Sequence, residues 1–363
     1  MHDLPRPPRP APVPAPGDGV SFVMPVLNER DYLERAVRSV LAQDVAVPTE
    51  IILALGPSSD GTEGVAQRLA GTDPRVRLVR NPAAHIPVGL NVAIRAARYP
   101  TIVRVDAHSE LEPGYTGAAL ATLARVEAAN VGGVMRADGR TPFQRAVARA
   151  YNSRIGLGGG AYHGGTAEGP AESAYLGVMR RAVLEEVGLF DEGIRRGEDW
   201  ELNLRIRHAG YRVWFDPELE VTYWPRESWT RLIRQFRATG SWRGELVRRF
   251  GRRNGLRFFA PPALVVAVGA SLVVGVLQVT GAVTGWPSAA ASVVHLPVAA
   301  YAALLVAVSA GRGGGRGFRD RLWTLAVLPS MHLAWGVGFL QGLLRGARGT
   351  VDTSRLARNT PLP

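Results

Sequence analysis

The chain contains no cysteine, which excludes disulfide bonds and thiolate metal ligands from its chemistry. Acidic residues are also scarce: 31 Asp and Glu face 43 Lys and Arg, which gives a formal net charge of +12. The first residues lack the apolar core of a signal peptide, and we interpret Met1–Asp18, rich in proline and arginine, as a disordered cytoplasmic tail. Apolar residues are instead concentrated after Phe258.

The net positive charge has two possible explanations. A surplus of this size is common among nucleic-acid-binding proteins. Here, however, the densest arginine cluster, Arg243–Arg257, lies directly before the first long apolar stretch. Basic residues beside a membrane segment mark its cytoplasmic side and attract anionic lipid headgroups. We therefore predict membrane lipids as partners and expect no nucleic acid.

Three apolar stretches approach or exceed the roughly 20 residues that cross a bilayer as a helix. They are Phe259–Val283, Ala289–Ala310 and Leu322–Leu344, and the first two contain no charged residue. The third is interrupted by Pro329 and His332, so it either spans or is re-entrant. These stretches predict a multi-pass protein of the cell inner (plasma) membrane with a cytoplasmic catalytic domain.

The arginines around these stretches give conflicting topologies. Arg243–Arg257 and the group from Arg312 to Arg321 both fit the inside. Three full spans would then place Arg345 and the basic tail that follows it (Arg348, Arg355 and Arg358) outside, against the positive-inside rule. Either the third stretch does not cross or the tail breaks the rule, and both alternatives stay open.

The first 220 residues alternate short apolar runs with amphipathic stretches. The runs predict strands, at Val20–Val26, Glu50–Leu55, Val76–Val79, Thr101–Val105 and Val131–Met135. Between them apolar residues recur at helical spacing, and two acidic pairs indicate capping boxes: Asp31 with Glu34, and Asp60 with Glu63. Such alternation predicts an α/β fold, a mostly parallel sheet with helices on both faces.

We therefore expect five regions along the chain. They are a tail at 1–18, a catalytic domain at 19–227, an interfacial basic segment at 228–257, a membrane domain of two to three helices at 258–345, and a tail at 346–363. Within the catalytic domain, Gly156–Gly169 is rich in glycine. We interpret it either as a plain connection between ordered elements or as a mobile active-site loop.

Two predicted strands end in polar residues. After the first, Pro25 leads to Asn28 and Glu29, which either cap the next helix or face a nucleotide, because ligands bind at the carboxyl ends of such strands. After the fourth, Asp106 is followed by His108. This pair suits a divalent cation that bridges a diphosphate, although a strand-terminal Asp can equally cap a turn.

Two further segments carry candidate groups. Glu198 and Asp199 begin a predicted helix, where acids often only complement the helix dipole; the functional alternative is a general base for an acceptor hydroxyl. Gln235 to Trp242 lies before the first apolar stretch. Its aromatic and basic residues either anchor the chain at the membrane interface or cover a donor site.

Taken in order, these motifs resemble the family-2 inverting glycosyltransferases of the GT-A fold, a Rossmann-like fold, and especially the membrane-attached branch that includes succinoglycan-type enzymes. The resemblance covers about Val20 to Phe250, and single motifs are weak whereas the ordered series is specific. The series comprises Met24-Pro-Val-Leu-Asn-Glu29, Asp60-Gly-Thr62, Asn81-Pro82, Pro87-Val-Gly-Leu-Asn-Val-Ala-Ile94, Val105-Asp-Ala-His108, Tyr175-Leu-Gly-Val178, Gly188-Leu-Phe-Asp-Glu192 and Gly197-Glu-Asp199.

The resemblance implies roles for individual residues. Asp106, with His108 in the place of a second acid, would hold Mn²⁺ or Mg²⁺ with the donor diphosphate. Asp199 would be the catalytic base, with Glu198 beside it. The resemblance also implies a donor-binding set, namely Pro25, Asn28, Glu29, Asp60, Asn81, Gly89, Asn91, Arg104, Asp106, Gln235 and Trp242.

Three departures from the family pattern affect specificity. Leu55-Gly56 stands where relatives often carry two acids, one of which contacts the donor base, so uridine specificity is not implied. His108 replaces a metal-site acid. Ser241 stands where an arginine would precede Trp242 in polymerising members, so processive polymerisation is not implied.

The leading functional hypothesis is inverting transfer of a sugar from a nucleotide-diphosphate sugar to a hydroxyl of a lipid-linked or other glycan acceptor, in cell-envelope or exopolysaccharide synthesis. Two alternatives remain. One is a polyprenyl-phosphate glycosyl synthase, which attacks with a phosphate and needs no strong general base. The other is a non-catalytic membrane scaffold that kept the fold.

Overall fold

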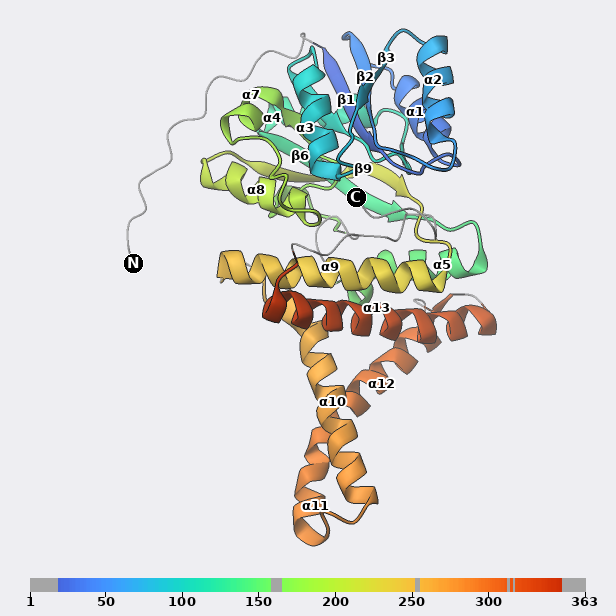
Figure 1. Cartoon of the computed structure of the whole chain (residues 1–363), viewed down its shortest axis with the longest axis vertical. Coiled ribbons are helices and arrows are strands. Elements are labelled where there is room, and N and C mark those ends of the chain that lie inside the picture. The colour runs from blue at the N-terminus through green and yellow to red at the C-terminus, as the bar shows by residue number, and fades with distance from the viewer. Residues whose placement is uncertain (1–18, 158–164, 252–254, 312–313, 316, 348–363) are drawn as a thin grey trace. The chain divides into compact units, whose positions relative to one another are not determined.

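The computed structural model describes residues 19–157, 165–251, 255–311, 314–315 and 317–347 (Figure 1). The described chain divides into two compact units, one of residues 19–137 and 165–224, the other of residues 138–157 and 225–347. The expected tail at 1–18, residues 348–363 of the tail expected at 346–363, the centre of Gly156–Gly169, and Arg312 and Arg316 lie outside the described residues.

The first unit is built on one sheet. Its path runs β3-β2-β1-β4-β8-β6-β9-β5, with β7 pairing to β9, and the β3-β2-β1-β4 half is parallel throughout. The strands are β1 (Val20–Val26), β2 (Thr49–Leu55), β3 (Val76–Arg80), β4 (Thr101–Arg104), β5 (Ser109–Leu111), β6 (Asn130–Ala137), β7 (Gly169–Pro170), β8 (Val178–Arg180) and β9 (Val213–Tyr223). The five strands predicted from the sequence are confirmed within one or two residues at each end.

Helices cover both faces of this sheet because successive strand residues point to opposite sides. Phe22 and Met24 of β1 join one apolar cluster, whereas Val23 joins the other. The first cluster packs against α1 (Leu33–Leu41), α2 (Thr62–Thr72) and α4 (Tyr115–Arg125); the second packs against α3 (Ile86–Ala96), α7 (Arg181–Glu186) and α8 (Glu198–His208). The predicted α/β architecture is therefore confirmed.

The predicted capping boxes are wrong in detail. Helix α1 begins after Tyr32, and no side chain caps it, so Asp31 and Glu34 do not form a box. Helix α2 begins after Gly61, and the Asp60 carboxylate instead accepts from the Thr62 amide. Local side-chain hydrogen bonds compete with the box pattern, because short acidic side chains can also accept bonds from nearby turns.

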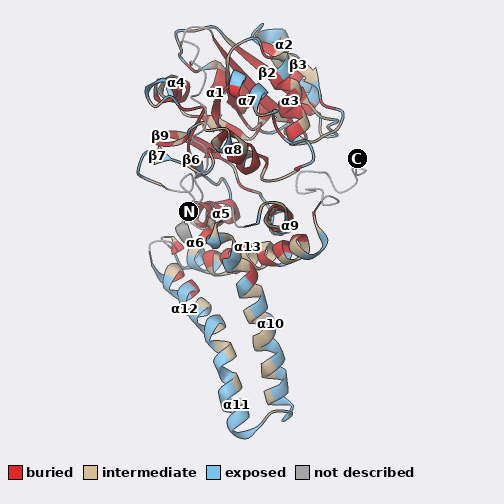
Figure 2. Ribbon diagram, turned by 90° about the vertical axis from the view of Figure 1, so that its left-hand side faces the viewer, coloured by how far each residue is buried: buried red, intermediate tan, exposed pale blue. Residues whose placement is uncertain are grey.

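The second unit holds all the long apolar helices. Its elements are α5 (Pro142–Tyr151), α6 (Arg154–Leu157), α9 (Trp229–Phe250), η2 (Leu256–Phe259), α10 (Ala260–Val279), α11 (Gly285–Ala291), η3 (Ser292–His295), α12 (Leu296–Ala310) and α13 (Phe318–Arg345). Three stretches of it are long and apolar enough to cross a membrane: Leu256–Val279, Gly285–Ala310 and Phe318–Arg345. Figure 2 shows α10 to α12 almost entirely in the colours of intermediate and exposed residues.

One segment of the catalytic domain expected at 19–227 falls outside the first unit. Residues 138–157 cluster with the second unit rather than the first. The reason lies in α5, where Phe143 packs against Trp229 with ring centroids 5.6 Å apart and Tyr151 packs against Phe236 at 5.8 Å. The apolar face of α5 is thus buried against α9, a contact that strand–helix alternation does not reveal.

Candidate active site

The loops after β1 and β2 are held together by polar side chains from both. The backbone amide of Asn28 donates to Ser58 Oγ at 3.0 Å, and Asn28 Oδ1 accepts from the Ser59 amide at 2.9 Å. The Glu29 amide donates to Thr62 Oγ1 at 2.9 Å. Asn28 has a φ of 54°, a left-handed conformation that asparagine tolerates better than most residues.

Asp60 ties the same two loops together. Its carboxylate accepts from the amides of Thr62 at 3.0 Å and Arg30 at 3.1 Å. Burial alone would raise the pKa of Asp60, but hydrogen bonds from the Thr62 side chain and from these amides lower it below its usual value. Asp60 therefore orders the loops around the predicted donor site.

Helix α3 packs closely against the end of β1 at Gly89, where a side chain would not fit. A Cβ at Gly89 would lie 2.7 Å from Asn81 Nδ2 and 3.3 Å from Pro25 Cβ, so these three predicted donor-site residues meet closely. The Asn81 amide group donates to the His85 carbonyl at 3.0 Å.

Asn91, by contrast, is buried and points to another segment. It accepts from the Phe190 amide at 3.0 Å and donates to the Phe190 carbonyl and to Glu192 Oε1, both at 2.9 Å. These bonds fix the Gly188-Leu-Phe-Asp-Glu192 motif to α3. They give Asn91 a role in holding that motif in place, and its predicted donor contact stays a prediction.

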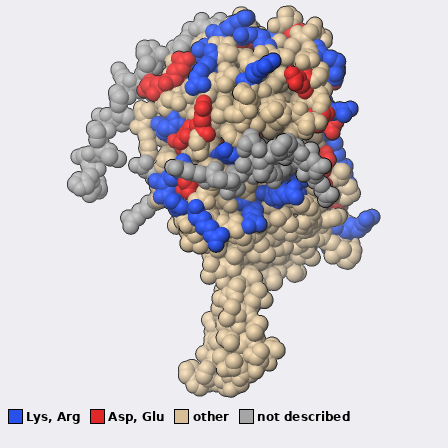
Figure 3. All heavy atoms as spheres, in the orientation of Figure 1, with Lys and Arg blue, Asp and Glu red and all other residues tan. Residues whose placement is uncertain are grey.

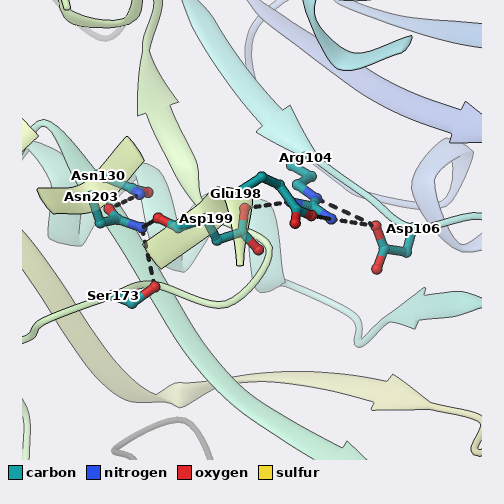
Figure 4. Close-up of polar contacts among 7 residues, drawn as sticks. All are labelled: Arg104, Asp106, Asn130, Ser173, Glu198, Asp199 and Asn203. Atoms are coloured by element: carbon teal, nitrogen blue, oxygen red, sulfur yellow. Dashed lines mark hydrogen bonds and ion pairs between the residues drawn. The ribbon is translucent and has the colours of Figure 1, made fainter. Parts of the chain in front are cut away.

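The candidate active site centres on Arg104, the last residue of β4 (Figure 4). Its side chain is 4% exposed and contacts three carboxylates. The distances are 3.2 Å to Asp106 Oδ1 and 3.1 Å to Glu198 Oε1, and Arg104 Nη1 also donates to Asp199 Oδ1. The structure thus brings together the predicted metal-site acid and the predicted base pair, which lie more than 90 residues apart in sequence.

Charge and burial shift the pKa values of this cluster. Burial alone would lower the pKa of the Arg104 guanidinium, but Asp199, Asp106 and Glu198 raise it well above its usual value, so the group stays charged. Burial raises the pKa of Asp199 to about 7; Arg104 opposes this, and the charges of Glu198 and Asp106 add to it. The Asp199 side chain still exposes 27% of its surface, so a substrate can reach it.

Three residues outside the predicted set hold α8 in position. Asn203 donates to the Asp199 carbonyl at 2.8 Å and to Ser173 Oγ at 3.3 Å, and its own oxygen accepts from Asn130 Nδ2 at 2.7 Å (Figure 4). Both asparagines are buried, at 1% exposure each. The sequence signal for this network was weak, because it consists of single polar residues inside apolar elements.

The chemistry of Asp106 and His108 fits a divalent cation that a substrate helps to bind. The His108 ring lies 3.4 Å from Glu29 Oε1 and packs edge-on against Tyr223, with centroids 5.3 Å apart. No group of three or more His, Asp or Glu in the part of the chain that the structure describes could hold a metal by itself. One carboxylate and one imidazole suit Mn²⁺ better than Mg²⁺, which prefers oxygen ligands, when diphosphate oxygens and water complete the coordination.

The last two predicted donor residues belong to the second unit. Gln235 and Trp242 lie on α9 with 9% and 1% exposure. Trp242 is among the largest fully buried side chains, so it contributes to packing within that unit. A donor contact by either residue stays a prediction.

Comparison with known sequences gives a consistent result. Residues 21–188 match the family described as Glycosyl transferase family 2. The chain is 30% identical to the succinoglycan biosynthesis protein ExoA of Rhizobium meliloti over 328 residues, which cover 89% of this chain and 94% of the relative. It is 22% identical to a dolichyl N-acetyl-α-D-glucosaminyl phosphate 3-β-D-2,3-diacetamido-2,3-dideoxy-β-D-glucuronosyltransferase of Methanococcus voltae, over 63% of this chain and 74% of the relative.

Comparison with solved structures supports the fold. The mannosyltransferase PcManGT from Pyrobaculum calidifontis, determined in complex with GDP-Man and Mn²⁺, superposes with a TM-score of 0.55 at 19% identity. The match covers 93% of this chain and 91% of that structure. It confirms the predicted GT-A architecture followed by apolar helices.

Proposed function

This chain belongs to glycosyl transferase family 2, and from that premise we propose that it is a membrane-bound, inverting enzyme that uses a nucleotide-diphosphate sugar and a divalent metal. The observation that carries the proposal is the cluster around Arg104. It joins a carboxylate suited to the metal–diphosphate end of a donor, Asp106, to a carboxylate suited to proton removal, Asp199.

The metal assignment rests on the donor set at the end of β4. Asp106 and His108 would hold Mn²⁺ or Mg²⁺ together with the donor diphosphate, and the solved structure of PcManGT contains Mn²⁺ and GDP-Man. The bound cation would supply charge that offsets the negative charge of the departing nucleotide diphosphate. The predicted donor residues Pro25, Asn28 and Gly89 lie in β1, in the loop after it and in α3.

The transfer step is assigned to α8. Arg104 contacts Oδ1 of Asp199, so we assign Oδ2 to the acceptor hydroxyl. Asp199 takes the hydroxyl proton as the acceptor oxygen forms a bond to the anomeric carbon, and the bond from that carbon to the diphosphate breaks on the opposite face. One displacement of this kind inverts the anomeric configuration. Glu198 also pairs with Arg104, and its charge adds to the effect of burial in raising the pKa of Asp199.

The acceptor is proposed to be lipid-linked. The apolar helices of the second unit would hold the enzyme at the cytoplasmic face of the inner membrane, next to lipid substrates. One relative supports this substrate class by name, because its name gives a dolichyl-phosphate-linked sugar; the other relative belongs to succinoglycan biosynthesis. We accordingly propose a role in cell-envelope or exopolysaccharide synthesis.

Donor binding is testable by thermal unfolding of the detergent-purified protein with UDP-, GDP- and dTDP-sugars, with and without Mn²⁺. We expect one nucleotide class to raise the melting temperature, because a ligand at 100 times its Kd stabilises by about 2.7 kcal/mol. The increase should require Mn²⁺ and disappear in Asp106→Ala. Asp44→Asn, an exposed acid beyond α1, is the matched control and should respond like the wild type.

The outcomes separate the proposal from its rivals. Stabilisation that ignores both the metal and Asp106→Ala would contradict the metal assignment. No response to any nucleotide would contradict the transferase proposal and favour a scaffold that kept the fold. The panel also identifies the donor base, which Leu55-Gly56 leaves open.

A further inference from the structure

The third long apolar helix differs from the other two in how it is surrounded. In α10 and in the α11–α12 stretch, 6% of the most apolar window is buried, against 39% in α13. Within the second unit, Figure 1 shows α13 alongside α9, with both running across the direction of the hairpin that α10 to α12 form. Helix α13 already differs in composition, because it contains Pro329 and has charged residues in its first turn, and its surroundings set it further apart.

Glycines bring α9 and α13 into close contact. A Cβ at Gly240 of α9 would lie 2.0 Å from the Trp335 carbonyl oxygen, and one at Gly244 would lie 2.2 Å from that of Phe339. From the other side, a Cβ at Gly342 would lie 1.8 Å from the Ser241 carbonyl oxygen. Spacing of small residues by four positions lets helix backbones approach in this way. The second half of α13 is therefore packed along α9.

The first half of α13 is packed along α5 and α6. Arg149 pairs with Asp320 at 3.3 Å, and the Phe143 and Trp323 rings lie 5.6 Å apart. Near the middle of α13, His332 Nε2 lies 2.9 Å from the Ile155 carbonyl oxygen.

These neighbours are incompatible with a helix that crosses hydrocarbon. Arg237 of α9 donates to Gln341 of α13 at 3.0 Å, and Glu245 pairs with Arg249 at 2.8 Å on the same stretch of α9. Placing α13 across the bilayer would carry these charged residues, and Arg149 of α5, into the apolar core. A charge at the bilayer centre costs at least about 2.5–3.5 kcal/mol.

The opposite face of α13 is exposed and apolar. Phe318, Leu322, Val337 and Leu344 are 76%, 49%, 38% and 78% exposed. Their spacing places them on one stripe of the helix. A helix with one packed face and one exposed apolar stripe, flanked by arginines, suits the boundary between headgroups and acyl chains.

The hairpin, unlike α13, has the uncharged composition expected of membrane-spanning helices. No charged residue occurs between Phe258 and Gly311, and Figure 3 shows no charged atoms along the part of the hairpin that faces the viewer. Its polar groups bond to each other across the two arms: Ser271 Oγ lies 2.7 Å from His295 Nδ1, and Gln278 Nε2 donates to Ser292 Oγ at 3.0 Å. At 24 and 26 residues, each arm exceeds the roughly 20 needed to span.

We propose that the chain crosses the bilayer twice, through the hairpin alone, and that α9 and α13 lie flat in the headgroup region of one leaflet. The exposed Arg231 and Arg234 of α9 would then contact lipid phosphates, and neither has an ion-pair partner among the residues that the structure describes. The end of α13 remains on the side where α9 lies. This arrangement puts Arg319, Arg321 and Arg345 on one face of the membrane and satisfies the positive-inside rule.

The native lack of cysteine makes this topology directly testable. Three single variants place a thiol at exposed positions: Thr72→Cys in the first unit, Thr284→Cys at the hairpin tip and Arg345→Cys at the end of α13. Each is treated with a membrane-impermeant maleimide in intact spheroplasts and after permeabilisation. We expect Arg345→Cys to label like Thr72→Cys and Thr284→Cys to show the opposite pattern. Opposite patterns for Arg345→Cys and Thr72→Cys, or one pattern for all three, would overturn the proposal.

A depth measurement tests the flat placement separately. Val337→Cys in α13 and Val273→Cys in the middle of α10 carry an environment-sensitive fluorophore in reconstituted vesicles, both at exposed positions. Spin-labelled lipids then quench from a shallow or a deep position. We expect the shallow lipid to quench Val337→Cys more strongly and the deep lipid to quench Val273→Cys more strongly. Deep quenching of both would contradict the flat placement of α13, whatever the enzyme's activity.

Discussion

Asp199→Asn is expected to lower transfer by about 10²–10⁴-fold, the usual contribution of a positioned general base. Asparagine keeps the size of the side chain and one oxygen for Arg104, so the fold should persist. Donor binding should also persist, because Asp106 and His108 are unchanged. The measurement is the rate of labelled-sugar transfer at saturating donor, beside the donor-dependent rise in melting temperature.

The pH profile gives the same prediction a second readout. A base works when deprotonated, and burial raises the pKa of Asp199 to about 7. The wild-type rate should therefore rise with pH through this region and level off above it. The rate is measured with Mn²⁺ present, and a bound cation that offsets the Asp106 charge removes one cause of the raised pKa, so we expect the step at or below this pH.

Two results would remove Asp199 from the mechanism. One is near wild-type transfer by Asp199→Asn, and the other is a residual rate in that variant that keeps the wild-type pH step. The exposed acid Asp44 provides the matched control, and Asp44→Asn should retain the wild-type rate and profile.

Arg104→Met is expected to destabilise the protein by about 3–5 kcal/mol, the cost of leaving buried charges without their partner. The side chain is 4% exposed, and its loss leaves Asp106, Glu198 and Asp199 facing one another. Thermal unfolding in detergent without metal should show a fall of roughly 6–20 °C, since 1 kcal/mol corresponds to about 2–4 °C in a domain of this size.

The loss of unfolding free energy in Arg104→Met, relative to the wild type, should become smaller as the pH falls. Without the guanidinium, the pKa of Asp199 loses the charge that opposes the effect of burial and rises further above its unfolded value, so the folded state binds more protons at low pH and gains stability there. Arg38→Met is the matched control, because Arg38 forms an exposed pair with Glu34 at 2.5 Å, worth at most about 0.5 kcal/mol. Two results would contradict the role of Arg104 in stabilising the carboxylate cluster. One is an equal loss of stability in the two variants, and the other is a loss in Arg104→Met that grows on acidification.

Several features were predictable because local sequence determines them. The runs at Val20–Val26 and Thr101–Val105 are short, apolar and β-branched, and the structure places strands at both. Asp106 follows such a strand, so its place at the edge of the sheet follows from the fold. Strand β9 was missed because Asp216, Pro217 and Glu218 interrupt its apolar alternation.

Other features depend on contacts that the sequence does not record. Arg104 ends a buried strand and lies between the buried residues Val103 and Val105, and a buried cation requires carboxylate partners. Its partners on α8, however, are more than 90 residues away. The third apolar stretch is long and apolar enough to span, and Pro329 and His332 left its placement open; the packing of α13 against α5 and α9 is the observation that distinguishes it.

The central claim is most directly tested by following a labelled sugar from the donor that the binding panel identifies. The enzyme is supplied with two acceptors, a monosaccharide on polyprenyl diphosphate and polyprenyl phosphate itself. We predict label on the monosaccharide, in a linkage of inverted anomeric configuration, and its loss in Asp199→Asn. Label on polyprenyl phosphate that persists in Asp199→Asn would contradict this account and identify a polyprenyl-phosphate glycosyl synthase.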